Sequence, residues 1–221
     1  MAGLTKKTFE FLKGIKLNNN RDWLEANRPL YEASKKEMET LTEAMLKEML
    51  PFEPLFAATT PKSCLFRLNR DVRFSADKSP YKTAFGSYMS PNGKNAYHGG
   101  YYLHVEPGNC FVAAGVWMPQ GETIAKIRQE IDYNAYQLIK IIENKSFKAN
   151  FSKIEGEQLK KAPKGYDPTH PAIDLLRYKS WTVSHKFTQD EMLQTDFSKS
   201  FGKLAKQLKP FNDFFTLAIE H

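Results

Sequence analysis

An alternating segment, a tight turn and an apolar run constrain the fold of this 221-residue chain more than any other feature. Residues 99–106 alternate apolar and polar side chains, Pro107-Gly108-Asn109 turns the chain, and residues 110–118 return as a nearly continuous apolar strand. Strands joined by so short a turn pair antiparallel, because a parallel pair needs a long crossover. The pattern therefore predicts a hairpin within an antiparallel sheet.

The segments before this hairpin have the apolar spacing of helices. Residues 5–15 predict a short amphipathic helix, and a second helical region follows it and breaks near Pro29. A longer helix with a stripe of Met and Leu, which we interpret as core packing, then runs to Pro51. The N-terminal quarter of the chain is therefore expected to be helical.

The segments after the hairpin alternate between the two element types. Residues 121–144 and 170–179 predict helices, and residues 181–187 alternate as a strand. Thr188 and Glu191 form a capping-box pattern that opens a C-terminal helical region. The order of elements predicts an α+β fold, with a mainly antiparallel sheet packed by N-terminal, central and C-terminal helices. We expect a single domain over residues 1–221.

Composition places the chain among ordinary globular proteins. Its hydrophobic content of 41% is enough for a buried core, and its net charge of +7 favours anionic partners. No run approaches the roughly 18 apolar residues of a membrane span, and the N-terminus lacks the apolar core of a signal peptide. We therefore expect a cytoplasmic protein without a membrane partner. Its two cysteines, Cys64 and Cys110, are expected to be buried core residues.

Residues 67–82, here called the basic segment, are the most charged window between apolar anchors. The segment holds five cations and two carboxylates: Arg67, Arg70, Arg73, Lys78, Lys82, Asp71 and Asp77. We favour an extended strand, since Ser79-Pro80 forces an extended exit. The polar face of that strand would carry Arg67, Asn69, Asp71 and Arg73, and the apolar face would carry Leu68, Val72 and Phe74. A helix would group the arginines differently.

Two interpretations of these charges stay open. Two carboxylates do not neutralise five cations, so either acidic residues from elsewhere complete a structural ion-pair network or a bound anion does. Arginine offers a planar fork of donors that matches phosphate or carboxylate oxygens. The candidate ligand-binding residues are Arg67, Arg70, Arg73, Lys78, Tyr81 and Lys82.

A catalytic reading of the basic segment rests on Tyr81. Its hydroxyl, beside Lys78 and Lys82, can act as a general acid or base, with Asp71 or Asp77 as a second group. The alternative, which we favour, is that Tyr81 packs after Pro80 as part of the loop. Whether the protein is an enzyme stays open.

The spacing of the basic segment resembles a known family signature. The matching positions read Arg67-x-x-Arg70-Asp71-x-Arg73-Phe74-x-x-x-Lys78-x-x-Tyr81, with Asp77 before the lysine. This resembles the DUF2461 family of uncharacterised bacterial and fungal proteins, and residues 170–179 resemble its second recurring block. The resemblance supports treating the segment as a site and implies no reaction. Arg177 and Lys179 of the second block are candidates to join that site.

Three functions follow from these observations. The first is binding, with or without turnover, of a phosphorylated or carboxylated small molecule at the basic segment. The second is nucleic-acid binding, with Tyr101, Tyr102 or Phe74 stacking on bases. The third is a purely structural charge cluster in a protein-interaction scaffold. The sequence leaves the oligomeric state open.

Motifs for common cofactors and metals are missing from the sequence. It contains no dinucleotide fingerprint, phosphate-binding glycine loop, nucleophile elbow or His-Glu-x-x-His pattern, so we expect no cofactor. A metal site would require His104, His185 and a carboxylate such as Glu106 to converge, and we do not expect one.

Overall fold

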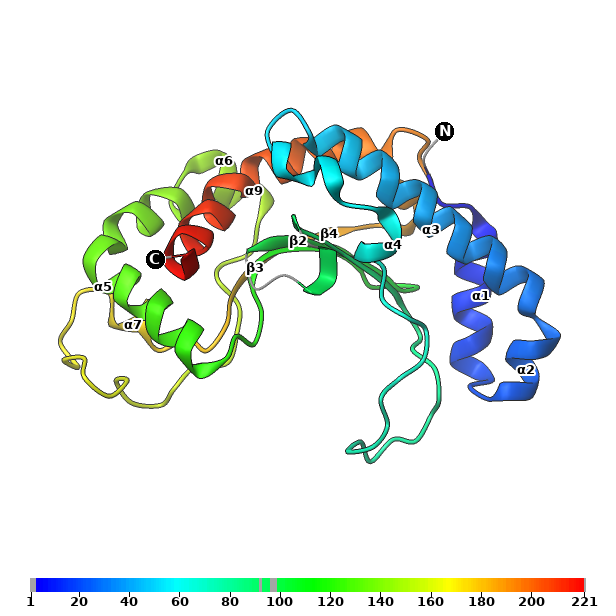
Figure 1. Cartoon of the computed structure of the whole chain (residues 1–221), viewed down its shortest axis with the longest axis horizontal. Coiled ribbons are helices and arrows are strands. Elements are labelled where there is room, and N and C mark those ends of the chain that lie inside the picture. The colour runs from blue at the N-terminus through cyan, green and yellow to red at the C-terminus, as the bar shows by residue number, and fades with distance from the viewer. Residues whose placement is uncertain (1–2, 92, 96–98, 221) are drawn as a thin grey trace. The chain divides into compact units, whose positions relative to one another are not determined.

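The computed structural model describes residues 3–91, 93–95 and 99–220, and its fold is α+β (Figure 1). One antiparallel sheet has the strand order β1-β2-β3-β4. Its strands are β1 (Phe85–Met89), β2 (Gly100–Val105), β3 (Cys110–Val116) and β4 (Trp181–Phe187). The predicted hairpin is confirmed as β2 and β3, with Gly108 at φ +80° in the turn between them.

Helices precede, interrupt and follow the sheet in the order that the sequence predicts. The longer ones are α1 (Lys6–Leu17), α2 (Arg21–Ala26), α3 (Arg28–Met49), α5 (Gly121–Ile142), α6 (Lys145–Asn150) and α9 (Phe197–Glu220). Short turns of helix are η1 (Pro54–Ala58), α4 (Pro61–Cys64), η2 (Gly93–Asn95), α7 (Ile173–Leu176) and α8 (Gln189–Met192). The predicted capping box is confirmed at α8, where the Thr188 and Glu191 side chains each accept from the other's backbone N–H.

The contacts divide the chain into two compact units. The first comprises residues 1–96, 102–112 and 186–203, and the second comprises residues 97–101, 113–185 and 204–221. Each unit is therefore assembled from segments that are distant in the sequence.

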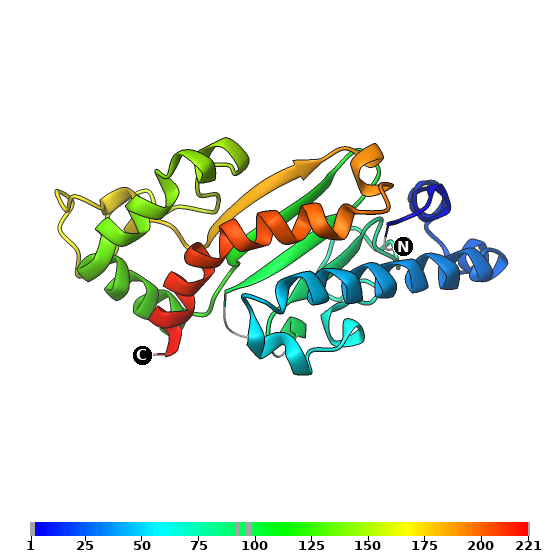
Figure 2. The ribbon, with the colours of Figure 1, turned by 90° about the horizontal axis from the view of Figure 1, so that it is seen from above.

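The first unit is built around α1, α3 and β1. The predicted Met and Leu stripe of α3 is confirmed as core, with Met38, Leu41 and Met45 almost fully buried. Phe11 of α1 stacks on Phe85 of β1 at a centroid distance of 5.8 Å. The first turns of α9 lie against the end of α3, where Gly202 faces the Cβ atom of Glu48 (Figure 2).

In the second unit Trp181 is fully buried, and its ring lies at a centroid distance of 6.2 Å from the Phe215 ring in the C-terminal half of α9. The Asn212 side chain of α9 accepts a hydrogen bond from the Gly115 N–H at 2.8 Å and donates one to the Gly100 carbonyl at 3.2 Å. Gly115 has φ +108°, and a Cβ there would lie 2.0 Å from the Trp181 carbonyl oxygen. Only glycine fits this position.

One element differs from the sequence predictions. The helix predicted at residues 170–179 is wrong beyond one turn, because only Ile173–Leu176 is helical. The following residues pair with another strand-like segment instead: the Leu159 N–H donates to the Arg177 carbonyl at 2.8 Å, and Gln158 bridges Tyr178. Cys64 and Cys110 are free and buried, as predicted. Within the described residues, no helix is long and apolar enough to span a membrane.

Candidate functional site

The basic segment lies in the first unit as an irregular antiparallel ribbon that extends from the edge of β1 (Figure 1). Single bridges join Leu65 to Ser87 and Asn69 to Tyr81, and the Arg70 N–H donates to the Pro80 carbonyl at 2.9 Å. The predicted strand is thus reduced to single bridges, and no regular strand forms in residues 67–82.

The predicted division of this ribbon into a polar and an apolar face holds only in part. Leu68 is buried as predicted, with 3% of its surface exposed. The placement of Phe74 on the apolar face is wrong, because the chain turns at Arg73 and Phe74 and leaves the Phe74 ring 96% exposed. The alternation of a strand does not continue through this turn.

Arg70 is bound to groups within the loop that closes the ribbon. Its guanidinium pairs with the Asp77 carboxylate and also donates to the Ser79 carbonyl at 3.3 Å. The Ser79 hydroxyl and N–H donate to Asp77 at 2.6 and 2.9 Å. These hydrogen bonds from Ser79, and that from Arg70, lower the pKa of the Asp77 carboxyl to about 2. Asp77 is therefore engaged as an anion in holding the loop.

Arg73 and Lys78 also find partners within the loop. The Arg73 guanidinium donates to both Asp71 oxygens at 3.0 and 2.7 Å, and the pair is solvent-exposed. Lys78 donates to the Val72 carbonyl at 3.0 Å. The two acidic residues of the basic segment, Asp71 and Asp77, thus form ion pairs with Arg73 and Arg70.

Arg67 and Lys82 differ from these residues. Within the part of the chain that the structure describes, neither side chain makes a hydrogen bond or an ion pair. The Lys82 ammonium lies 5.2 Å from the centroid of the Phe66 ring. Burial, and then the charge of Arg67, lower the pKa of Lys82. Among the described residues, these two neighbouring cations are therefore left without a carboxylate partner.

Tyr81 is mainly a packing residue. It is buried, with 7% of its surface exposed. The Asn19 side chain holds its backbone on both sides, donating to the Tyr81 carbonyl at 2.9 Å and accepting from the Tyr81 N–H at 3.0 Å. This arrangement favours the packing interpretation of Tyr81.

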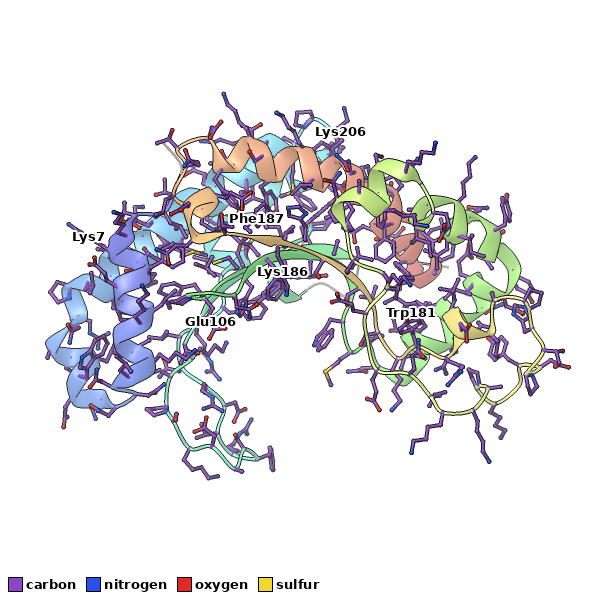
Figure 3. The ribbon with its side chains drawn as sticks, turned by 180° about the vertical axis from the view of Figure 1, so that it is seen from behind. Lys7, Glu106, Trp181, Lys186, Phe187 and Lys206 are labelled. Atoms are coloured by element: carbon purple, nitrogen blue, oxygen red, sulfur yellow. The ribbon has the colours of Figure 1, made fainter. Side chains whose placement is uncertain are left out.

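A second group of polar side chains in the same unit comes from alternate positions of β2 and its exit. The Tyr102 hydroxyl lies 2.9 Å from Nδ1 of His104, and Nε2 of His104 lies 3.4 Å from the Glu106 carboxylate. We call Tyr102, His104 and Glu106 the Tyr–His–Glu row. Buried Leu103 and Val105 point to the opposite side of the strand. Figure 3 shows Glu106 just beyond the end of β2.

Glu106 is fixed by residues from outside its own strand. Lys16 of α1 lies 3.5 Å from one carboxylate oxygen, and the Thr83 hydroxyl donates to the same oxygen at 3.3 Å. Asn109 donates to the other oxygen at 3.4 Å. Burial opposes ionisation, but hydrogen bonds from His104 and Asn109 and the charge of Lys16 keep the pKa of Glu106 below its ordinary value.

Phe66 connects the unpaired cations with the Tyr–His–Glu row. Its ring packs edge-on against Tyr102 at a centroid distance of 6.1 Å and also lies against the Lys82 ammonium. Gly86 of β1 makes room for the Tyr102 hydroxyl, since a Cβ there would lie 2.9 Å from that oxygen. The cations and the row therefore border one part of the first unit.

Other candidate residues from the sequence lie elsewhere or are buried. Arg177 belongs to the second unit, where its guanidinium donates to the Leu159 carbonyl at 2.8 Å, so its joining the basic segment stays a prediction. His185 binds the Asn150 carbonyl in that unit. In the described residues no group of three His, Cys, Asp or Glu is arranged for a metal. The prediction that Tyr101 stacks on bases is wrong, because only 1% of its surface is exposed.

Sequence reasoning weighed His104 and Glu106 only as metal ligands and did not find the row. A signal was present: Tyr102, His104 and Glu106 occupy positions i, i+2 and i+4 of the clearest predicted strand, which places them on one face. The contacts that fix Glu106 come from Lys16 and Thr83, far away in the sequence. No spacing rule reveals such contacts.

Comparison with known proteins identifies a family for this chain. The family model described as "Conserved hypothetical protein (DUF2461)" matches residues 7–214. No curated protein and no solved structure matches the chain. The matched range includes the basic segment and the Tyr–His–Glu row.

Proposed function

We propose, from the premise that this chain belongs to the DUF2461 family, that its first unit binds a small phosphorylated or carboxylated molecule at Arg67 and Lys82. One observation carries the proposal: these two neighbouring cations have no carboxylate partner among the described residues. Like charges placed together raise each other's free energy, and an anion between them reverses that effect. The family description assigns no ligand, so the proposal rests on the charges alone.

The environment of Lys82 strengthens this proposal. Its ammonium is half-buried over Phe66, and burial lowers its pKa, so the charged form is held at a cost in free energy. A bound phosphate or carboxylate would stabilise the charged ammonium and offset part of that free-energy cost. Each charge-assisted hydrogen bond to such an anion is worth about 1.5–3 kcal/mol. Arg67 supplies the planar fork that phosphate and carboxylate oxygens fit.

Arg70 and Arg73 have a different role in this proposal. Their guanidiniums are engaged by Asp77 and Asp71, which supports a structural role for both residues. We therefore propose that the ligand contacts Arg67 and Lys82, at the two ends of the basic segment. Arg70 and Arg73, between them, hold the structure of the loop.

An exposed aromatic side chain favours nucleic acid as a second candidate ligand. Phe74 stands almost fully exposed at the turn of the basic segment, with the Arg73 guanidinium 5.8 Å from its ring centroid. An exposed ring beside a cation fits base stacking combined with phosphate contact. Binding of this kind weakens steeply with salt.

Thermal unfolding in the presence of ligands tests the proposal. Inorganic phosphate, citrate, a mononucleotide and a short oligonucleotide are each added at low and at high salt. A ligand at about 100 times its dissociation constant stabilises the folded protein by about 2.7 kcal/mol. We expect this shift for a small anion and expect Arg67→Gln or Lys82→Gln to abolish it.

Arg73→Gln is the matched control, because it removes the same charge from an arginine that is already paired. It should leave the shift with small anions in place. Equal losses in Arg67→Gln and Arg73→Gln would show a general charge effect and contradict a site at Arg67. A shift with the oligonucleotide alone, lost at high salt, would favour nucleic acid, and the absence of any shift would overturn both candidates.

A further inference from the structure

The geometry of the Tyr–His–Glu row fixes where its protons lie. A carboxylate only accepts hydrogen bonds, so Glu106 requires the imidazole proton on Nε2 of His104. In the neutral imidazole Nδ1 is then an acceptor, and the Tyr102 hydroxyl donates to it at 2.9 Å. The row therefore consists of a phenol, a base positioned to take its proton, and an anion behind that base.

Neighbouring residues fix the protonation of Glu106 and Tyr102 and the orientation of the His104 ring. Glu106 stays ionised because Lys16, Asn109 and His104 together outweigh its burial. The His104 ring stacks on Phe111 at a centroid distance of 4.7 Å, which fixes its plane. Burial raises the pKa of Tyr102 to about 12, so the phenol keeps its proton at neutral pH and has one to donate.

His170 lacks this arrangement. It also faces a carboxylate, with Nε2 3.1 Å from Asp132, but its Nδ1 accepts from the Ala172 N–H at 3.0 Å. A backbone amide is not an acid that a reaction deprotonates at neutral pH, whereas a phenol beside a base is. Of these two histidines, His104 is the one that joins a carboxylate to an ionisable hydroxyl.

We propose that Tyr102, His104 and Glu106 form a general-base relay that removes a proton from a hydroxyl group of the ligand bound at Arg67 and Lys82. The substrate class is a small phosphorylated or carboxylated molecule that carries a hydroxyl group. The identity of the substrate rests on the proposed function, whereas the relay rests on the distances within the row. Phe66 contacts both Tyr102 and Lys82, so the row and the proposed anion site lie close together.

The proton transfer balances without any further reagent. The ligand O–H bond breaks and a new Oη–H bond forms on Tyr102, while the original Oη–H bond breaks and an Nδ1–H bond forms on His104. The ligand keeps the electron pair as an alkoxide, and the new imidazolium faces the Glu106 carboxylate. Arg67 and Lys82 stabilise the negative charge on the ligand, and the reverse transfer restores the row.

Tyrosine sulfonylation tests the relay without knowledge of the substrate. With p-toluenesulfonyl fluoride, an Oη–S bond forms, the S–F bond breaks, fluoride leaves, and the phenolic proton moves to Nδ1 of His104. Mass spectrometry of the intact folded protein gives the rate at each tyrosine. Tyr133 and Tyr136 are internal references, since they are 71% and 68% exposed and neither hydroxyl touches a histidine in the described structure.

We expect Tyr102 to react about tenfold faster than these better exposed tyrosines, because a hydrogen-bonded base activates it. His104→Gln should remove that advantage, and Glu106→Gln should reduce it, while the thermal unfolding midpoint reports whether each variant is folded. A Tyr102 rate no higher than that of Tyr133 in the unmodified sequence would overturn the relay. So would a rate unchanged in folded His104→Gln.

Protection by phosphate separates the relay from the anion site. Inorganic phosphate should slow sulfonylation of Tyr102, Arg67→Gln should remove this protection, and the matched control Arg73→Gln should keep it. A reactive Tyr102 that phosphate never protects supports the relay and overturns its placement beside the anion site. A phosphate-dependent thermal shift with an unreactive Tyr102 supports the anion site and overturns the relay.

Discussion

The loop of the basic segment and the Tyr–His–Glu row lie in the same unit but satisfy their charges in opposite ways. In the loop, Asp71 binds Arg73 and Asp77 binds Arg70, all within seven positions and mostly exposed to solvent. In the row, Glu106 is bound by residues up to 90 positions away and is mostly buried. A dense run of charges thus marks a loop that closes on itself, whereas sparse polar residues on a strand mark the place where distant segments meet.

The largest expected effect is that of a substitution at Gly86, which packs against Tyr102 of the Tyr–His–Glu row. Gly86→Val places carbon where the Tyr102 hydroxyl now lies, because even a Cβ would approach that oxygen to 2.9 Å. We expect a loss of about 1–3 kcal/mol in the free energy of unfolding, as for other overpacked positions. Denaturant unfolding measures it. Gly108→Val is the control, since a Cβ at Gly108 meets no atom within 4 Å and only its positive φ is strained.

The Tyr102–His104 hydrogen bond should also break in Gly86→Val. The reactivity of Tyr102 toward the sulfonyl fluoride would then fall to that of ordinary tyrosines. Retention of both full stability and Tyr102 reactivity would contradict the packing described at this position.

An intermediate effect concerns the anchor of the basic segment. Asn19→Ala removes two hydrogen bonds to the Tyr81 backbone, which should lower the free energy of unfolding by about 1–2 kcal/mol. Asn19→Asp keeps the acceptor for the Tyr81 N–H but sets a carboxylate oxygen against the Tyr81 carbonyl, so it should also lose stability. Amide hydrogen exchange at Tyr81 should rise in Asn19→Ala and stay lower in Asn19→Asp. Equal exchange in all three proteins would show that the ribbon holds its position without Asn19.

The smallest effect concerns Asp77 in the loop. Its pKa of about 2 lies below the ordinary 3.8, so its contribution to loop order is complete above about pH 4 and is lost as the pH falls toward 2. Carboxyl chemical shifts in NMR measure this titration. Ser79→Ala should move the pKa upward, because Ser79 supplies the largest part of the shift. An ordinary pKa in the unmodified chain would show that the loop does not hold Asp77 as described.

Local patterns predicted much of the fold, and contacts between distant segments account for the errors. Alternation around residues 107–109 predicted the hairpin, and Thr188 with Glu191 predicted a real helix start, because both depend on neighbouring residues. The helix expected at residues 170–179 gave way to pairing with residues 157–159, which have no strand pattern of their own. Tertiary hydrogen bonds overrode the local helical spacing there.

In the candidate site, too, local patterns were predictable and contacts between distant segments were not. The sequence singled out the basic segment, but the strand predicted there is reduced to single bridges, and the charge count alone did not separate Arg67 from Arg70. That separation depends on how the loop turns, which places Asp77 against Arg70 and leaves Arg67 near Lys82. The Tyr–His–Glu row has its members on one predicted strand face, yet only the fold brings Lys16 to Glu106.

The exposed turn at Phe74 makes the basic segment a practical point of attachment. Phe74 is 96% exposed, and the nearby Arg73–Asp71 and Arg70–Asp77 ion pairs are formed within the loop. A cysteine at position 74 would carry a fluorophore on a scaffold whose two native thiols, Cys64 and Cys110, are buried. Binding of a ligand at Arg67 and Lys82 would then change the fluorescence of the label. The labelled protein would serve as a sensor for screening ligands.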